Sequence, residues 1–438
     1  IEIVSPKAGA KSDDNEGLRS IEDVLIAMLD GDANKQELYV NVLAAKKLGI
    51  IKSKRAIDSL INAMFLRTLK EERMYQVARR SLLQIGTPAL ERLLATLAGQ
   101  NQTLTAFGRT YGILEWEWMD SPMLVQAIGD FQNPIAAMPL IEKQALPLNL
   151  PAGLSEKQVE MWKMAQSNRI KVSMLALGLV GTDDIIEKAT EIISNPENDI
   201  QQRLDTATAL ALMGTPAAQD ALLAIYKSER DGRFRAPMQL PIALSLDWAH
   251  FEAYQNLMKK DKSEVVAAYI EQTQQIKDQL AALEECKDEM ACWRTKLALL
   301  DPVVAQKAAL AIGQLNDKSK DTIDTLFKRF RTAKSTETDL RRFILISALR
   351  LGRGDEYVFV KLVDLWKHQK DMGTSMGKFW SSELEMGVLA WEAQFGFDAK
   401  KVEAPEAEPE PAAKPAAKPV AKPAAEAPAK PAVEAPAK

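Results

Sequence analysis

The sequence predicts an all-α fold: a right-handed α-solenoid in which pairs of helices stack side by side. Three observations carry this prediction. Hydrophobic residues make up 47% of the 438-residue chain but aromatic residues only 6%. The apolar stretches are rich in Ala, Leu, Ile and Met, a bias that favours helices because unbranched side chains lose little rotamer freedom there. A short pattern typical of a helix end also recurs along the chain, and helix-start signals follow several of its copies.

The recurring pattern is a small residue, three further positions, then an aliphatic residue and Gly. The small and aliphatic residues are four apart and share one helix face. The small residue allows a neighbouring helix to approach closely, and the Gly can adopt the left-handed conformation that ends a helix. Several of the successive glycines are 33 to 43 residues apart. The copies are Ala44/Leu48/Gly49, Ser81/Ile85/Gly86, Ala176/Val180/Gly181, Ala209/Met213/Gly214, Ala308/Ile312/Gly313 and Ser347/Leu351/Gly352, with a weaker copy at Ile128-Gly129.

New helices start soon after these patterns with a polar cap and Pro. The cap oxygen accepts a hydrogen bond from a free backbone amide, and Pro loses nothing at the first helical position. The starts are Thr87-Pro88, Ser121-Pro122, Thr215-Pro216 and Asp301-Pro302. One unit is therefore a helix, a short turn and a second helix, with a period of about 37 residues. A single pair cannot bury its apolar face, but a stack of pairs can.

Five regions follow from this reading. We expect a flexible lead-in at 1–16, repeats at 17–229, an irregular helical segment at 230–300, repeats at 301–399 and a disordered tail at 400–438. The stretch 230–262, which contains Pro237 and Pro241, fits the repeat poorly, and the first helix after it is too long for one unit. The expected helices are 19–30, 34–48, 54–66, 70–85, 88–98, 102–114, 134–144, 156–180, 183–194, 199–213, 216–227, 264–285, 302–315, 320–332, 338–351, 356–370 and 379–394.

The tail is expected to be disordered because of its composition. From Val402 onward it contains only Ala, Pro, Lys, Glu and Val. Such a segment cannot bury enough apolar surface to offset its chain entropy, and its frequent Pro favours extended polyproline II segments.

The repeat pattern resembles HEAT repeats. The segments AAKKLGIIKSKRAIDSLINAM (44–64), SLLQIGTPALERLLATL (81–97) and ALALMGTPAAQDALLAIY (209–226) are most similar to that family, and 127–142 is similar to its turn and second helix. HEAT repeats define an architecture and carry no catalytic signature, so the resemblance implies a binding role without naming the ligand. Together with the tail and the cysteine pair, the chain resembles the envelope-associated HEAT-repeat proteins of Gram-negative bacteria.

The chain has two cysteines, Cys286 and Cys292. On one continuous helix they would be ~9 Å apart along the axis and on different faces, too far for a disulfide. A turn at Lys287-Asp288-Glu289 would bring them together. We therefore expect a disulfide that staples a helix–helix turn in an oxidising compartment, and the alternative is two reduced, partly buried thiols in the cytosol. A zinc site lacks ligands, because no further Cys or His is close in sequence.

Two local clusters are candidates for binding a partner. Trp116 and Trp118 alternate with acids in the segment 115–120 and could anchor a partner, since Trp is favoured at interface centres; alternatively they fill a gap between repeats. The second cluster is basic and could contact phosphates or an acidic partner; alternatively its charges lie on solvated helix faces or complement helix dipoles. It consists of Lys328, Arg329, Arg331, Arg341 and Arg342.

Nothing in the sequence predicts a catalytic, cofactor or metal site. His250 and His368 are the two histidines, and no nucleophile, zinc, phosphate-loop or dinucleotide motif accompanies either. The net charge of −4 gives no basic footprint for nucleic acid, and no apolar run reaches the ~18 residues of a membrane span.

The predicted function is a non-enzymatic scaffold that binds a partner protein along the concave face of the solenoid. That face is expected from the helices at 34–48, 70–85, 199–213, 302–315 and 338–351. The predicted location is the periplasm or cell envelope, with the cytoplasm as alternative. Because the chain starts at Ile1, a removed signal or lipid-attachment segment is one explanation and trimming is another. The alternative functions are a HEAT-like enzyme, such as a DNA-base glycosylase or a pigment-attaching lyase, and a cytosolic regulatory subunit.

Overall fold

The computed structural model describes residues 20–31, 38–66, 72–119, 121–146 and 150–402. Most of these residues lie in helices, and none lies in a strand. The chain divides into a unit that ends at Val402 and a second unit, Glu403–Lys438. The predicted lead-in (1–16) and the tail from 403 lie outside the described residues. The all-α array of stacked helix pairs that the sequence predicts is confirmed for the first unit.

The helices follow one another with short connections, and three of them (α3, α9 and α11) are preceded by a single 3-10 turn. Their bounds are α1 Ile21–Leu29, α2 Leu38–Ile50, α3 Ile57–Met64, α4 Glu72–Ile85, α5 Thr87–Leu97, α6 Gln102–Tyr111, α7 Glu115–Met119, α8 Pro122–Asp130, α9 Ala137–Ala145, α10 Glu156–Val180, α11 Ile186–Ser194, α12 Ile200–Met213, α13 Pro216–Ser228, α14 Gly232–Ser245, α15 Trp248–Lys260, α16 Glu264–Gln272, α17 Gln274–Cys286, α18 Met290–Leu297, α19 Pro302–Gln314, α20 Lys320–Thr332, α21 Thr338–Leu351, α22 Glu356–Asp371 and α23 Ser375–Phe395.

The segment 230–262 is a regular helix pair, α14 and α15, although the sequence was expected to be irregular there. Pro237 and Pro241 both lie inside α14. Each removes one backbone donor and normally disfavours a helix interior. However, α14 is buried along most of its length and packs against α12, α16, α17 and α19, so the burial of its side chains outweighs the local cost.

The single helix expected at 264–285 is two helices, α16 and α17. The chain leaves the helical conformation at Thr273, which has φ −94° and ψ 94°. This break lets α16 and α17 each pack separately against α14, while α17 also reaches α19. The apolar periodicity continues across the break, which is why it was not visible in the sequence.

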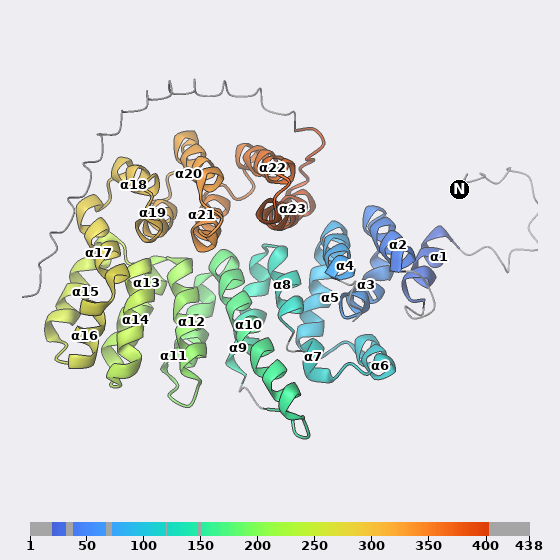
Figure 1. Ribbon diagram of the computed structural model, residues 1–438, viewed down its shortest axis with the longest axis horizontal. Helices are drawn as coiled ribbons and strands as arrows, with labels where there is room; N and C mark the ends of the chain where they lie inside the picture. Colours follow the sequence, from blue (N-terminus) through green and yellow to red (C-terminus); the bar gives the residue numbers. More distant parts are fainter. Residues whose placement is uncertain (1–19, 32–37, 67–71, 120, 147–149, 403–438) are drawn as a thin grey trace, which may run out of the picture. The chain divides into compact units, whose positions relative to one another are not determined.

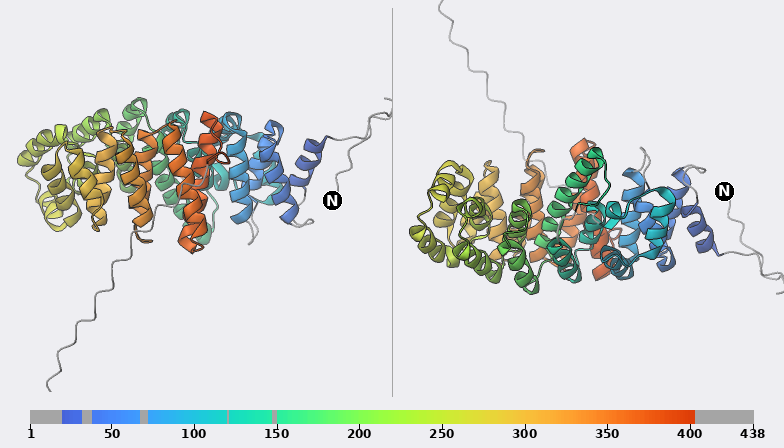
Figure 2. Two further views of the ribbon diagram at one scale, coloured as in Figure 1. Left: turned by 90° about the horizontal axis from the view of Figure 1, so that it is seen from above. Right: turned by 90° about the horizontal axis from the view of Figure 1, so that it is seen from below.

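The helices form two rows that run back along one another (Figure 1). In the first row α8, α10, α12 and α14 contact one another in sequence as its inner helices, while α9, α11, α13 and α15 form an outer layer. In the second row the inner helices are α19, α21 and α23, and α18, α20 and α22 form the outer layer. The views from above and below show the second row lying over the first (Figure 2).

The two rows contact each other through their inner helices. α14 packs against α19, α10 against α21, and α23 against α8 and α4. The inner face that the sequence predicts is therefore not an open wall, because the second row lies against the first. The chain reverses direction through α16 and α17, which link the two rows.

Within a row, the recurring pattern joins neighbouring repeats. A Cβ atom added at Gly49 would lie 2.7 Å from the Ser81 Cα, and one at Gly129 would lie 2.9 Å from the Ala176 Cβ. The same close approach joins Gly313 to the Ser347 side chain at 2.9 Å. The Gly of one pattern is thus the contact point for the small residue of a later one.

This finding corrects the role that the sequence assigned to three of these glycines. Gly49, Gly129 and Gly313 lie inside the last turn of their helices, and the residue with positive φ comes three positions later, at Lys52, Gln132 and Asn316. Gly214 ends α12 in the left-handed conformation, as predicted (φ 61°, ψ 16°). Gly86 also has a positive φ (87°), but its ψ of −147° lies outside that conformation. Gly181 and Gly352 end their helices with negative φ (−60° and −107°), so the predicted conformation is wrong for them as well. A glycine that must admit a neighbouring helix has to stay within the helical surface, so it cannot also terminate the helix.

Between the rows, side chains of the second row bind the carbonyl ends of inner helices in the first. Lys307 of α19 is fully buried, and its Nζ donates to the Leu244 carbonyl at 3.0 Å and to the Leu246 carbonyl at the end of α14. Arg350 of α21 donates to the Leu212 and Met213 carbonyls at the end of α12, both at 2.6 Å. Gln394 of α23 donates to the Phe131 carbonyl at the end of α8. The last carbonyls of a helix lack partners within it, so each bond satisfies a group that would otherwise be buried unpaired.

We expect Gly49→Ala to destabilise the protein by about 1–3 kcal/mol, because the added methyl would press on the Ser81 backbone and the helices would have to move apart. The matched control is Gly387→Ala in α23, where the nearest atoms are the ends of flexible side chains at 3.3 Å and 3.6 Å. Chemical unfolding of both variants measures the difference. Equal stability of the two variants would contradict the close-packing role of Gly49.

The buried Lys307 also predicts a pH dependence of stability. Burial lowers the pKa of Lys307 to about 7, with the Asp247 carboxylate opposing the shift. Between about 7 and the ordinary value of 10.5, the unfolded chain binds a proton that the folded chain does not, so stability rises with pH in this window. We expect unfolding free energies of the wild type to increase from pH 7 to pH 10 by a few kcal/mol at most (~1.4 kcal/mol for each pKa unit). Lys307→Met should flatten this slope, and an unchanged slope would show that another group is responsible.

Candidate functional site

The tryptophan cluster does not present Trp118 to a partner. Trp118 lies in the short helix α7 and is 1% exposed. It packs near Gly108 of α6, where an added Cβ would lie 3.8 Å from the indole Nε1. The burial favours the alternative that Trp118 fills a gap between helices. The side chain of Trp116 lies outside what the structure describes.

The basic cluster is divided among separate structural contacts. Both Arg329 and Arg341 are buried. Arg329 donates to the Leu297 carbonyl at the end of α18 (3.0 Å), and Arg341 donates to the Ala333 carbonyl just after α20 (2.6 Å). Arg329 also pairs with Glu337 at 3.2 Å. These contacts favour the helix-dipole alternative for the two arginines.

The other three basic residues are exposed or half-exposed. Arg331 forms an ion pair with Asp364, and Lys328 is exposed. Arg342 pairs with Asp339 at 3.2 Å and also lines the cavity described below. The five cations therefore do not meet in one patch. Their role in binding a partner stays a prediction without support from their arrangement.

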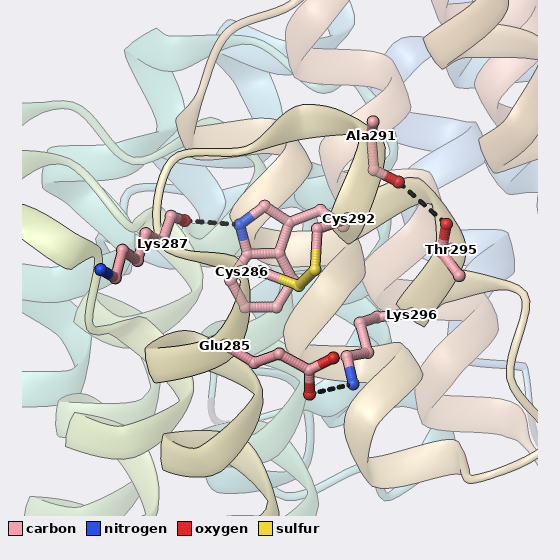
Figure 3. The surroundings of a disulfide bond; sticks show 8 residues. Glu285, Cys286, Lys287, Ala291, Cys292, Thr295 and Lys296 are labelled. Carbon is pink, nitrogen blue, oxygen red and sulfur yellow. Dashed lines mark hydrogen bonds and ion pairs between the residues drawn. A yellow bond between two sulfur atoms is a disulfide. The ribbon is translucent and has the colours of Figure 1, made fainter.

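The two cysteines lie at disulfide distance, as the sequence predicts. α17 ends at Cys286, and a turn at Lys287 leads into α18, which carries Cys292; the two Cα atoms are 5.3 Å apart (Figure 3). Lys287 has a φ of 49°, which is uncommon for a residue with a side chain. Its carbonyl accepts a hydrogen bond from the Trp293 indole at 2.8 Å. A 2.5 Å ion pair between Lys296 and Glu285 joins the same two helices.

A cavity of about 270 Å³ lies between the inner helices of the two rows and is a candidate binding site. Its walls come from α8 and α10 in the first row and from α21 and α23 in the second. Most of the wall is apolar, and one aromatic residue, Phe379, is 42% exposed. The apolar lining residues are Val172, Leu175, Ala176, Leu179, Leu345, Ile346, Leu349, Phe379, Trp380 and Met386.

The polar part of this cavity includes a fully satisfied ion pair. Arg79 of α4 binds Asp130 of α8 through two hydrogen bonds of 2.7 Å. Burial lowers the pKa of Arg79, but the Asp130 carboxylate outweighs this effect and raises it above its ordinary value. The Tyr75 hydroxyl donates within the same cluster to Gln126 at 2.9 Å. Charge and hydrogen-bonding capacity are therefore balanced in this pair.

Glu383 of α23 lines the same cavity and has no charged partner. It is partly buried, and no described residue gives it a hydrogen bond or an ion pair. Burial raises the pKa of Glu383, and the Arg79 and Arg342 charges only partly offset this. A carboxylate taken from water without a partner costs free energy.

A second cavity of about 290 Å³ lies between the rows on the other side of α21. It is lined by the end of α12, by α19 and by α21, and includes Arg350. We call the linings of these two cavities together the inner seam. Its lining residues come from both rows.

The residues of the inner seam could not be identified from the sequence. Arg79, Asp130 and Glu383 lie on three different helices, and their meeting depends on the return of the second row. The only available signal is that Arg79 and Glu383 interrupt apolar helix faces between core residues such as Leu82 and Trp380. That signal marks a polar group in the core without naming its partner.

The two histidines lie in ordinary helix-end contacts. The Nδ1 of His250 is 2.6 Å from Asp247 at the start of α15, and its Nε2 is 3.4 Å from Asp220. His368 is in the last turn of α22, and burial lowers its pKa. Within the described part of the chain, no three Asp, Glu, His or Cys side chains are arranged to hold a metal ion.

Comparisons with known proteins name no family. No protein-family model matches the chain, and no curated protein matches it. A crystal structure of an engineered protein is 12% identical, with a TM-score of 0.27, and the match covers 85% of this chain and 98% of that chain. A TM-score this low does not establish a common fold. Separately, no helix in the described ranges has the length and apolar character needed to cross a membrane.

We expect reduction of the Cys286–Cys292 disulfide to destabilise the protein by about 2 kcal/mol, because the bridge closes a short loop in the unfolded chain. Thermal unfolding with and without a phosphine reductant measures this effect. The Cys286→Ser/Cys292→Ser double variant should match the reduced wild type and should not respond to the reductant. A reductant effect of equal size in the double variant would place its cause elsewhere.

Proposed function

We propose that this chain is a non-enzymatic, HEAT-like scaffold that binds a segment of a partner protein in the inner seam. The observation that carries the proposal is the pair of cavities on either side of α21, each lined by both rows. Concave surfaces between helices are the usual binding sites of helical-repeat proteins, and both of these cavities lie between inner helices of the two rows.

The partner is a single segment rather than a globular domain. The rows contact each other at α10–α21 and α14–α19, so the space between them is narrow. An extended strand or one helix could lie along such a seam with its side chains in the two cavities. A folded domain would have to separate contacts such as those of Lys307 and Arg350.

The HEAT-like assignment is supported by the repeat unit itself. Helix pairs with a period of about 37 residues and the Gly-to-small contacts recur in both rows. Buried arginines that bind carbonyls near helix ends do so too, with Arg203 in the first row and Arg329 and Arg341 in the second. The non-enzymatic part of the proposal is supported by the seam, where Asp130 is held by Arg79 and Glu383 has no second acid or base bound to it.

An envelope location is the part of the proposal that rests on the cysteines. A disulfide between Cys286 and Cys292 persists in oxidising compartments such as the bacterial periplasm. We propose that the scaffold works there, in an envelope complex. A reduced pair in protein taken from its native cell would overturn this location and leave the seam unaffected.

Site-specific photo-crosslinking tests the binding site. A photoreactive side chain at Leu345, which lines the seam, should crosslink in native cells to one protein with a yield at least several-fold above that of an outer-surface position. The control position is Glu187 on α11, which is exposed on the outer layer. Sequencing the crosslinked peptide should identify one continuous segment. If both positions give the same products, or the seam position gives none, the scaffold proposal fails.

A further inference from the structure

The starting point is the charge of the first seam cavity. Arg79 binds Asp130 through two hydrogen bonds, and Arg342, which also lines the cavity, pairs with Asp339 outside the lining. Glu383 is left with no counter-charge bound to it among the residues that the structure describes. With each of these two pairs counted as neutral, an ionised Glu383 adds one unpaired negative charge to a largely apolar wall.

This unpaired charge determines the charge of the ligand. An anion would face both Glu383 and Asp130, and the guanidinium of Arg342 is already bound to Asp339. A cation would gain a hydrogen-bonded ion pair with Glu383, and such bonds are stronger than neutral ones. The ring of Phe379, which is partly exposed at the cavity, adds an aromatic face suited to a cation.

The size of the cavity determines how large the ligand can be. Its volume of about 270 Å³ is below the roughly 300–1,000 Å³ of pockets for drug-sized ligands. It fits one long side chain and not a cofactor. Lys and Arg have an apolar stem and a charged head, which matches a wall of Val172, Leu175 and Leu345 with a carboxylate at its edge.

Taking the proposed function as its basis, we propose that this cavity is the anchor pocket for a lysine or arginine side chain of the partner segment. The aliphatic stem lies on the α10 and α21 side chains, and the ammonium or guanidinium group binds the Glu383 carboxylate. The recognition element in the partner is thus a basic residue flanked by apolar ones. Without the partner, Glu383 is a partly buried charge that costs stability.

Small side-chain analogues test the pocket independently of any partner. n-Butylammonium and n-butylguanidinium are titrated into the full chain by calorimetry, with n-butanol and n-butyrate as matched neutral and anionic probes. Affinities in the roughly millimolar range are expected for ligands of this size. The two cations should bind about tenfold or more tightly than butanol, and butyrate should not bind.

Glu383→Gln separates a binding role from a structural one. This variant should weaken binding of both cations about tenfold while raising the melting temperature of the free protein, because an unpaired charge is removed. Glu187→Gln, at an exposed position on the outer layer, should change neither. A lower melting temperature for Glu383→Gln, or cation binding equal to that of the wild type, would overturn the pocket.

The crosslink at Leu345 distinguishes this inference from the proposed function. Equal crosslinking to the same partner in the wild type and in Glu383→Gln would overturn the anchor pocket and leave the scaffold intact. If cation binding depends on Glu383 but the seam position gives no crosslink, the proposed scaffold function would be overturned. The preference of the cavity for cationic ligands would then be supported. Loss of the crosslink in Glu383→Gln, with a lysine or arginine in the crosslinked segment, would support both.

Discussion

The carbonyl ends of three inner helices determine how the second row of helices packs against the first. α14, α12 and α8 each end against a side chain from the second row, namely Lys307, Arg350 and Gln394. A buried carbonyl without a donor costs about 1–3 kcal/mol, so these ends would have to face water if the second row lay elsewhere. The rows are therefore held together by polar groups that neither row satisfies alone. The inner seam and both of its cavities exist because of this closure.

Polar groups in the seam fall into two classes. Arg79 and Asp130 satisfy each other across two helices, so they stabilise the arrangement without needing a ligand. Glu383 has no such partner, although it lines the same cavity. A partly buried carboxylate without a partner costs free energy, and a cationic ligand would supply the interaction that the free protein lacks.

The disulfide lies just beyond the point where the chain reverses direction. Cys286 ends α17, which contacts α14 of the first row, and α18 starts the outer layer of the second. The bridge fixes a turn whose Lys287 has an unfavourable φ, and the Trp293 indole binds the carbonyl of that residue. A local covalent link at this turn maintains the angle at which the second row begins.

The sequence by itself determined most of the helices, their pairing and the cysteine turn, because those features depend on contacts between residues that are close in the chain. Caps such as Asp301-Pro302 and the four-residue spacing of Ala308 and Ile312 act within one helix or between neighbours. Only the tertiary structure decided that the array folds back on itself, that α14 tolerates Pro237 and Pro241, and that Glu383 lines a cavity beside Arg79. The direction of a solenoid is the sum of many small rotations between repeats, and no local pattern records that sum. The sequence therefore predicted an open concave face, while the side chains of the returning row narrowed it to a seam.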